Sequence, residues 1–546
     1  MSVSQLATTD AAAERSFRRA KRTVLFGIIA AVVGLLLFVV WREMYGEKFT
    51  ISKETTYITE PLREDGLPDY AAALDALASE GVTPENNAAV LYWQAFGPNE
   101  VPQSIRQEFF QRIGTSPPPP SRGTGDYLLS LSAFAGELEA RSPTTATMPI
   151  PEKDEIEVTA SLTERIFDRM ERAENTPWSA EEDPELTDWI LRNEKPLRLI
   201  VEATHRPCRY QPLFVVPEDG RQATLHHAFL PWVQSDREAA RLLCVRAMQR
   251  LHDGDIADAQ DDLLACHRLA RHAASGPWLI DWLIGVALDA NASEADIALA
   301  HHAAWSSAQA TAYRERLAAL PPFPPLAEKF DRAERFAMLD TIVSVARYGM
   351  ERVGFDPFNT PAALPTLLVH WDAALYKANA LSDLIVAAAA ESDPGARRRR
   401  VGEVQRAYGE FAAAAGLHSR QLSDRSGLAA DRLLSHLAPA AQAALDRELE
   451  PRSRADLMQV AFALSAYRAD HGSYPATLDE LAPRYIDAVP PDLFTGKPPI
   501  YRPKEGGGYV LYSVGHDATD NGGLSRADAS GGDDIVIRTP QPEATP

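Results

Sequence analysis

Apolar residues recur at steps of three and four along most of the chain between Thr56 and Glu450, and clusters of proline interrupt this pattern. Ala240, Cys244 and Met248 mark one such apolar face. The spacing is typical of amphipathic α-helices, because it gathers apolar residues on one side of a helix with about 3.6 residues per turn. Sustained alternation of apolar and polar residues, which would indicate strands, does not occur here. The pattern predicts a large and almost wholly helical domain over residues 56–450.

One predicted helical hairpin is clearer than the rest and turns at His252–Asp255. If two antiparallel helices pair about this turn, Cys244 and Cys266 lie at the same level. Two thiols placed in this way can form a disulfide outside the cytoplasm. Both also fall on apolar faces, where a free cysteine is a common small core residue. The pattern leaves a disulfide and a pair of free core thiols as alternatives.

The same hairpin reads Arg-Ala-Met-Gln-Arg-Leu-His-Asp-Gly-Asp-Ile-Ala-Asp-Ala over residues 246–259. This sequence resembles the turn between paired helices in tetratricopeptide-like repeats. Only one such unit is clear, and the roughly 34-residue period of a regular array is not visible. The resemblance implies helix pairs stacked as in a tetratricopeptide-like domain, and an irregular helical bundle is the alternative.

The segment Thr23–Trp41 contains no charged residue, and five basic residues precede it between Arg15 and Arg22. As a helix it spans about 28 Å, close to the thickness of the hydrocarbon core of a bilayer. The basic flank predicts that residues 1–22 are cytoplasmic and that the bulk of the chain lies outside. The prediction is a single-pass protein of the bacterial inner membrane with a periplasmic bulk. A cleaved signal peptide is the alternative, but no small-residue cleavage site follows Val40.

Charge and cysteine content narrow the classes of function. The formal net charge is −21, which argues against nucleic acid as a partner because a phosphate backbone needs a basic face. The three cysteines are too few for a disulfide-dense scaffold, and no Cys-x-x-Cys motif is present. Clustered acidic residues instead favour solubility and binding of divalent cations at particular loops.

The last sixth of the chain changes from a helical pattern to a strand pattern. Arg454–Tyr467 has helical spacing, and we expect the helix to stop at Gly472. Thr477 begins a capping-box sequence for a second, short helix. Tyr509–Val514 and Asp534–Ile537 are rich in aromatic and β-branched residues and are predicted strands. The expected structure is a helix against a small antiparallel sheet.

Three short sequences carry a family resemblance: Tyr-Arg-Ala-Asp-His-Gly-Ser-Tyr-Pro at 467–475, Leu-Asp-Glu-Leu at 478–481 and Ser-Val-Gly-His-Asp at 513–517. Together they resemble the C-terminal globular domain of the major pseudopilin of type II secretion systems. The resemblance implies a pseudopilin-like α+β domain over residues 452–540. In that family a hydrophobic helix leads directly into the domain, whereas here roughly 400 residues separate them and no pseudopilin processing site is visible. We therefore expect a borrowed module and not a subunit that polymerises.

Two arguments predict calcium in the loop after Val514. From Asp517 to Asp528, oxygen side chains fall at positions one, three, five, nine and twelve with glycine at six, which is the ligand pattern of a calcium loop. The pseudopilin resemblance also implies calcium, with Asp517 as one carboxylate and Asp533 or Asp534 as the later one. The two arguments differ on the second carboxylate, and a solvated acidic turn is the alternative. The predicted metal-site residues are Val514, Asp517, Thr519, Asn521, Asp528, Asp533 and Asp534.

Catalytic motifs are sparse. Glu202 and His205 form a Glu-x-x-His sequence on a predicted helix, a spacing that carboxylate-bridged metal bundles use twice. Glu328, Asp331 and Glu334 would have to supply the remaining ligands, and a surface helix end is the simpler interpretation. The sequence therefore favours a membrane-anchored interaction or scaffold protein with an unidentified protein partner in the cell envelope. The alternative is an extracytoplasmic metal-dependent hydrolase with its site in the helical domain.

Overall fold

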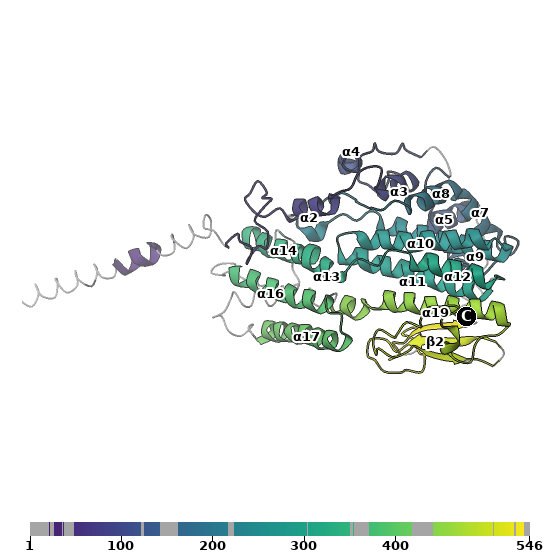
Figure 1. Cartoon of the computed structure of the whole chain (residues 1–546). Helices are drawn as coiled ribbons and strands as arrows, with labels where there is room; N and C mark the ends of the chain where they lie inside the picture. The colour runs from purple at the N-terminus through teal and green to yellow at the C-terminus, as the bar shows by residue number, and fades with distance from the viewer. Residues whose placement is uncertain are drawn as a thin grey trace, which may run out of the picture.

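The chain is mainly helical and ends in a small sheet (Figure 1). The computed structural model describes residues 21, 27–34, 37, 49–121, 125–141, 162–216, 223–302, 304–349, 353, 371–417, 441–505, 507–528 and 531–539. Within these residues there are sixteen α-helices and a three-stranded antiparallel sheet, all three strands lying after Pro498. The prediction of a mainly helical chain with C-terminal strands is confirmed.

The α-helices are α2 (Tyr70–Ser79), α3 (Ala88–Phe96), α4 (Gln103–Arg112), α5 (Leu131–Arg141), α6 (Leu162–Ala173), α7 (Pro184–Arg192), α8 (Glu194–Ala203), α9 (Val233–Asp253), α10 (Ile256–Ser275), α11 (Leu279–His302), α12 (Ser307–Ala318), α13 (Leu326–Lys329), α14 (Arg335–Tyr348), α16 (Trp371–Ala389), α17 (Pro394–Leu417) and α19 (Glu450–His471). Shorter helical turns are η1 (Leu225–His227), η2 (Phe330–Glu334) and η4 (Leu478–Leu481).

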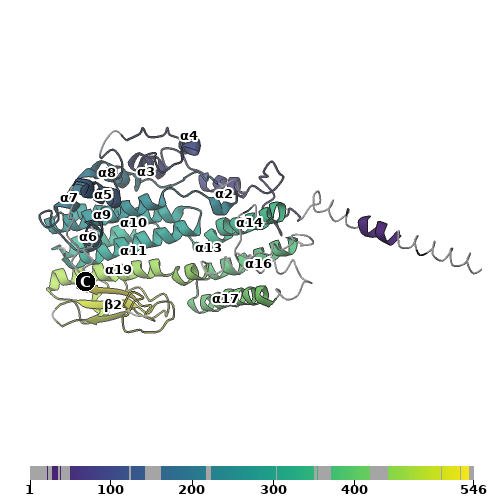
Figure 2. The same cartoon turned by 180° about the vertical axis from the view of Figure 1, so that it is seen from behind.

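Three long helices, α9, α10 and α11, pack side by side at the centre of the molecule (Figures 1 and 2). The turn between α9 and α10 is short because Gly254 takes a left-handed conformation with φ of +84° and closes the α9 C-terminus. Gly285 lets α11 approach α10 closely, since a Cβ at this position would lie 2.5 Å from the carbonyl oxygen of Ala270. The helical spacing read from the sequence thus corresponds to a packed hairpin.

The buried apolar side chains form two hydrophobic cores. One contains side chains of α3 to α12, α19 and the sheet, and the other contains side chains of α2, α13, α14, α16 and α17. Helix α11 belongs to both, because Leu279 and Trp282 near its start lie in the second core and Leu288 to Ala300 in the first. The two cores therefore meet at the junction of α10 and α11.

The C-terminal sheet has the order β1-β2-β3, with β1 at Ile500–Pro503, β2 at Tyr509–Ser513 and β3 at Ile535–Thr539. Strands β2 and β3 correspond to the two predicted strands. Strand β1 is missing from the prediction, because prolines before it, such as Pro498, are typical of irregular chain and Pro503 stands within it. Pro503 is accommodated since β1 is an edge strand, where a missing backbone donor costs little.

Helix α19 lies between the sheet and the helical body (Figure 1). It contacts α11 and α12 as well as β2 and β3, and both of its faces are buried: Leu457 and Val460 lie in the same core as Met458 and Phe462. Gly472 ends the helix in a left-handed conformation, and Thr477 forms a capping box at η4, as expected. The hydrophobic core is thus continuous across the domain boundary placed before residue 452.

Most of the predicted membrane anchor, Thr23–Trp41, lies outside the described residues. Residues 27–34 are helical and exposed. Among the helices of the described ranges, none combines the length and the apolar character that a membrane span requires.

Candidate functional site

The predicted calcium loop connects β2 to β3 and brings two of its aspartates together. The backbone N–H of Asp517 donates to Oδ2 of Asp533 at 3.0 Å, although the residues are 16 positions apart. Oδ1 of Asp517 accepts the N–H of Thr519 at 2.6 Å. Gly515, with φ of +72°, permits this approach because a Cβ there would collide with the backbone of Asp533. The pseudopilin resemblance implies Asp517 with either Asp533 or Asp534, and of these two Asp533 is the one that contacts Asp517.

Asp533 has one carboxylate oxygen, Oδ1, that is buried without a hydrogen-bond partner in the described part of the chain. Its backbone N–H donates to Oδ1 of Asn521 at 3.2 Å. The neighbouring Asp534 is 2% exposed and accepts the N–H of Gly523 at 2.7 Å, and burial raises its pKa. A buried carboxylate oxygen without a donor is unfavourable, so Oδ1 of Asp533 fits a site completed by a cation.

The second argument for calcium places Asp528 among the ligands, and the structure gives this residue other partners. Arg538 donates to both oxygens of Asp528, at 3.1 and 2.6 Å, and Ser525 donates to it as well. Hydrogen bonds from Arg538 and Ser525 lower the pKa of Asp528 to about 2. As a calcium ligand, Asp528 would have to leave this ion pair, whereas Asp517 has no ion pair with a basic side chain of the described residues.

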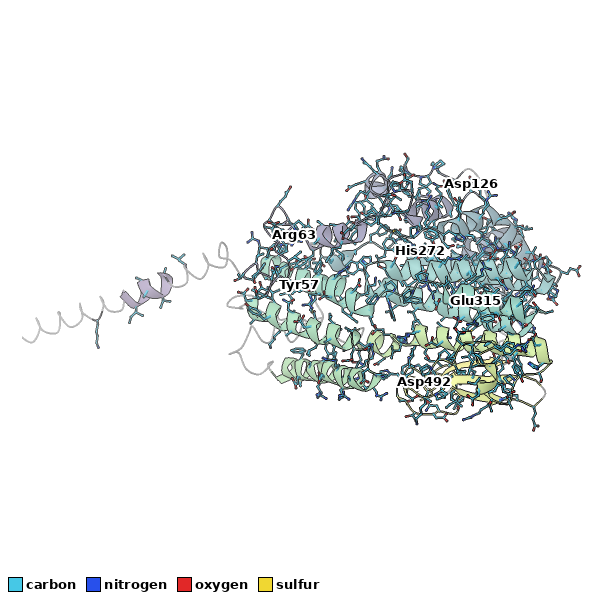
Figure 3. The ribbon with its side chains drawn as sticks, in the orientation of Figure 1. Tyr57, Arg63, Asp126, His272, Glu315 and Asp492 are labelled. Carbon is cyan, nitrogen blue, oxygen red and sulfur yellow. The ribbon has the colours of Figure 1, made fainter. Side chains whose placement is uncertain are left out.

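Val514 and Thr519, the other predicted site residues, differ in their surroundings. Val514 is buried at the end of β2 and donates its N–H to Oδ2 of Asp492 at 3.0 Å (Asp492 is labelled in Figure 3). Thr519 is exposed. Across the described ranges, no three histidine, cysteine or acidic residues are arranged to hold a metal ion. A calcium ion in this loop would therefore depend on Asp517 and Asp533 together with backbone carbonyls and water.

The loop also touches the helical body. Arg526 pairs with Glu450 at the start of α19 at 3.0 Å, and Arg454 of α19 pairs with Glu294 of α11 at 3.2 Å. A cleft of about 410 Å³ lies between these groups and is lined on the loop side by Asp533. The predicted calcium loop is consequently part of the contact between the C-terminal module and the scaffold.

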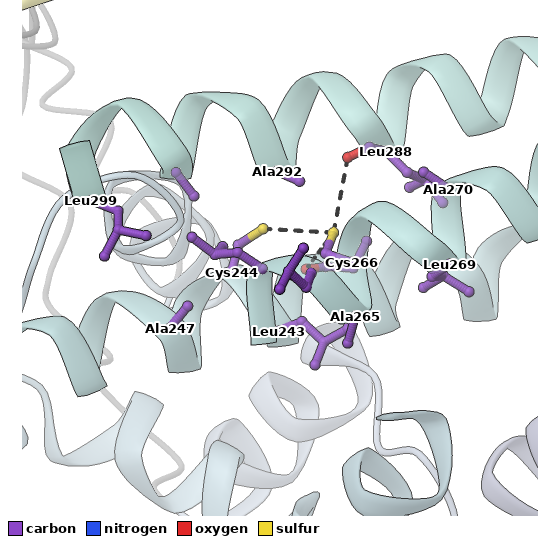
Figure 4. Close-up of a cluster of buried hydrophobic side chains, with 14 of the residues drawn as sticks. Leu243, Cys244, Ala247, Ala265, Cys266, Leu269, Ala270, Leu288, Ala292 and Leu299 are labelled. Atoms are coloured by element: carbon purple, nitrogen blue, oxygen red, sulfur yellow. Dashed lines mark hydrogen bonds between the residues drawn. The ribbon is translucent and has the colours of Figure 1, made fainter. Parts of the chain in front are cut away.

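Cys244 and Cys266 lie at one level of the α9–α10 hairpin, as the turn position predicts (Figure 4). Both side chains are fully buried and their sulfur atoms are 3.9 Å apart, with both thiols free. The shared hydrogen bond and burial raise the pKa of Cys244. The two sulfur atoms of a disulfide lie about 2.05 Å apart, so this pair could bond after a small movement. The disulfide therefore stays a prediction.

A buried ionic network lies one residue beyond Cys266. Nδ1 of His267 contacts Oδ1 of Asp289 at 2.6 Å, and Nε2 contacts Oδ2 of Asp296 at 2.9 Å. Arg271 also pairs with Asp289 at 2.6 Å, and the hydroxyl of Tyr313 donates to Asp296 at 2.7 Å. Because both ring nitrogens face carboxylates, His267 carries both protons. The network links α10, α11 and α12, and the sequence offers no short-range signal for it.

The residues of the hydrolase hypothesis do not come together. Glu202 and His205 are exposed at the end of α8. Asp331 accepts hydrogen bonds from Tyr57 and Arg335, and Glu334 accepts the N–H of Leu279. Asp331 and Glu334 thus have partners other than Glu202 and His205. The exposure of Glu202 and His205 is what a surface helix end predicts.

A cavity of about 210 Å³ lies where the two hydrophobic cores meet, at the C-terminal end of α10. It is lined by Leu74, Leu77, Ala78, Arg209, Tyr210, Gln211, Leu213, Trp232, His272, Ala273, Ser275, Gly276, Pro277, Trp278, Glu328, Lys329 and Arg332. These residues come from segments spread between α2 and η2, so only the tertiary structure brings them together. His272 is labelled in Figure 3.

Two basic side chains in the wall of the cavity have polar partners. Arg209, with a side chain 2% exposed, contacts Asp236 through two nitrogens at 2.8 Å each and stacks over the ring of Tyr92. Lys329 donates to the carbonyls of Ser275 and Gly276, so it caps the C-terminus of α10. Burial lowers the pKa of Lys329 to about 8.

A buried carboxylate lies behind the wall of the cavity and holds three lining residues. Asp281 accepts the backbone N–H of Trp278 at 3.1 Å and the indole N–H of Trp232 at 3.3 Å, and burial raises its pKa to about 6. Its carboxylate packs against Gly276, where no Cβ fits. Arg209, Lys329 and Arg332 are thus the basic residues of the cavity wall and Glu328 is its acidic residue.

Comparison of the chain with protein-family models, with curated proteins and with solved structures gives no match.

Proposed function

We propose that the protein is a single-pass, extracytoplasmic interaction protein, in which a helical scaffold presents a calcium-stabilised, pseudopilin-like C-terminal module to a protein partner in the cell envelope. The observation that carries the proposal is the contact between Asp517 and Asp533, with Oδ1 of Asp533 left without a partner. It joins the two ends of the loop through the backbone of Asp517 and the carboxylate of Asp533, one of the two later carboxylates that the pseudopilin resemblance allows.

The physical reason for calcium is electrostatic. Carboxylates that are gathered in one compact loop repel one another, and a divalent ion bound among them turns this repulsion into attraction. Calcium accepts carboxylates together with carbonyls and water in a flexible geometry, which suits an irregular loop. Its role would be structural: the closed loop keeps Arg526 against Glu450 and so fixes the module on α19.

The helical scaffold supports an interaction role through its construction. Helices α9 to α11 form paired antiparallel layers, of the kind that tetratricopeptide-like proteins stack into binding surfaces. Helix α19 joins this scaffold to the sheet through one shared core. A rigid connection of this sort holds a binding module in a fixed orientation relative to the membrane.

The test is thermal unfolding of the full chain in detergent, with millimolar calcium and with chelator. The full chain is used because α19 buries one face against the body. With a Kd near 10⁻⁴ M, 10 mM calcium stabilises by about 2.7 kcal/mol and raises the unfolding temperature. Asp517→Ala and Asp533→Ala should abolish the rise, whereas Asp487→Ala, at an exposed site in the same module, should keep it. An unfolding temperature that is the same with calcium and with chelator would contradict the calcium proposal.

The interaction role needs its own experiment. The full chain is purified from membranes with a mild detergent, with and without calcium, and proteins that co-purify are identified. A partner retained by the wild type and lost from Asp517→Ala is the expected result. A chain that purifies alone under both conditions would contradict a stable envelope partner.

A further inference from the structure

One face of α16 presents two large apolar side chains to solvent. Tyr376 is 52% exposed and Leu384 is 38% exposed, and Ala373 and Ala380 on the same face are exposed as well. The four residues follow one another at steps of three, four and four, so they form one stripe along the helix. The other faces of α16 are packed, mainly against α14 and α17. The stripe is therefore the part of α16 that remains open to an external surface.

The chain that follows the predicted anchor is fixed beside this stripe. The backbone N–H and the hydroxyl of Thr50 donate to Asp372 at the start of α16, at 2.7 and 2.9 Å. Two turns later, the side chain of Asn379 donates to the carbonyls of Glu54 and Thr55, at 3.2 and 2.7 Å. On a regular helix, Asp372 and Asn379 lie about a quarter of a turn around the axis from the stripe. This segment therefore runs along one edge of the stripe.

The length of chain before Phe49 limits how far α16 can lie from the membrane. Phe49 packs against the hydrophobic core that contains the side chains of α16. If Trp41 is the last residue of the anchor, eight peptide steps join it to Phe49 and span at most about 29 Å. Tyr376 follows Asp372 by about one helical turn. The start of the stripe is consequently within reach of the bilayer surface.

We propose that this stripe of α16 rests on the outer surface of the bilayer, with Tyr376 and Leu384 in the headgroup layer. Tyrosine suits this layer because its ring is apolar and its hydroxyl is polar. Lys377 and Asp383 stand at the two edges of the stripe, where charged groups can stay in water. The inference rests on the single-pass anchor of the proposed function and adds the part of the scaffold that meets the membrane.

The small size of the stripe favours a membrane over a protein as its occupant. Two large side chains and two alanines form a smaller patch than a stable protein–protein interface buries. A surface that is tethered beside the stripe needs only a weak attraction, because the short connection keeps the two at a high effective concentration. The stripe itself contains no charged residue. A bilayer of uncharged net character, such as phosphatidylcholine, should therefore be sufficient.

The experiment places an environment-sensitive fluorophore on the stripe of the full chain, reconstituted in nanodiscs of phosphatidylcholine. Tyr376→Cys and Leu384→Cys are labelled one at a time with a nitrobenzoxadiazole maleimide. The background is Cys208→Ser, because the other two cysteines are buried. Leu191→Cys is the matched control, since Leu191 is 63% exposed on α7, at the opposite end of the molecule from α16 (Figures 1 and 2). The quencher is phosphatidylcholine that carries a nitroxide on its headgroup.

We expect the nitroxide lipid to remove most of the emission from the labels on Tyr376→Cys and Leu384→Cys, and to leave the label on Leu191→Cys nearly unchanged. Quenching of all three labels, or of none, would overturn the proposal. Labels on the stripe that stay unquenched but emit at shorter wavelength than the control would show a protein cover, either a second copy or a partner, and would overturn it too. A chain that does not enter nanodiscs at all would refute the anchor itself, which distinguishes failure of the proposed function from failure of this inference.

Discussion

Replacing His267 with glutamine should remove a part of the stability that depends on pH. The ring is fully buried between Asp289 and Asp296, with contacts of 2.6 and 2.9 Å. Burial by itself would lower the pKa of His267, but the two carboxylates outweigh burial and raise the pKa to about 10. In the unfolded chain a histidine has a pKa near 6.5.

The direction of the effect follows from these two values. The folded state holds the proton more tightly than the unfolded state, so the contribution of His267 is fully present below about pH 6.5 and disappears as the pH rises through about 10. Each pH unit inside this window removes about 1.4 kcal/mol. Raising the pH from 6.5 to 9 should therefore reduce the stability advantage of the wild type over His267→Gln by about 3 kcal/mol.

Other groups near His267 do not obscure this difference. Asp289 is held ionised by Arg271 and His267, which outweigh its burial and keep its pKa well below the usual range. Burial and Asp296 keep the pKa of Tyr313 well above 10. Lys329, with a pKa of about 8, titrates in the same window but is present in both proteins, so its effect cancels.

The assay is urea unfolding of the full chain in detergent at pH 6.5 and pH 9, followed by tryptophan fluorescence. His252→Gln is the control, because His252 is exposed in the α9–α10 turn and should change little at either pH. If wild type and His267→Gln differ by the same amount at both pH values, His267 is not the protonated centre of the network.

Three further predictions concern packing, thiols and topology. Gly285→Ala should destabilise the protein by about 1–3 kcal/mol, because its Cβ meets the α10 backbone, whereas Gly136→Ala on α5 meets no atom within 4 Å and should be neutral or stabilising in the same urea assay. If Cys244 and Cys266 are oxidised in the periplasm, alkylation of the denatured chain should label one thiol instead of three, and labelling of all three would exclude the disulfide. With Thr23–Trp41 as an anchor, protease added to intact spheroplasts should digest the C-terminal part, and protection until lysis would reverse the orientation.

The sequence alone was sufficient to predict a structural feature wherever that feature depends on residues close together in the chain. Helix periodicity predicts α9 and α10, and a glycine that can adopt a left-handed conformation predicts the turn at Gly254. The position of that turn then places Cys244 opposite Cys266, because helix geometry converts residue number into distance. Gly472 and the capping box at Thr477 involve only neighbours within four residues.

The C-terminal module shows where local reasoning ended. Its helix α19 has an apolar stripe in sequence but is buried on two sides, since α11 and α12 cover the face that a free module would leave exposed. Asp528 fits the spacing of a calcium loop, but in the structure it forms an ion pair with Arg538 of β3. Strand β1 contains Pro503, a residue type that local rules exclude from strands, and only the position of β1 at the edge of the sheet makes this proline acceptable.

The cavity and the buried network were decided by tertiary structure alone. Asn87 illustrates why: its side chain accepts the backbone N–H of Tyr210 and donates to the carbonyl of the same residue, which holds the 209–213 segment against α3. That placement, and not any spacing near Arg209, brings its guanidinium into a cavity with Trp278 and Lys329. Periodicity can predict which residues are buried, but their partners depend on how separate segments pack. These segments are neighbouring helices in the His267 network and are more than a hundred residues apart at Asn87 and Tyr210.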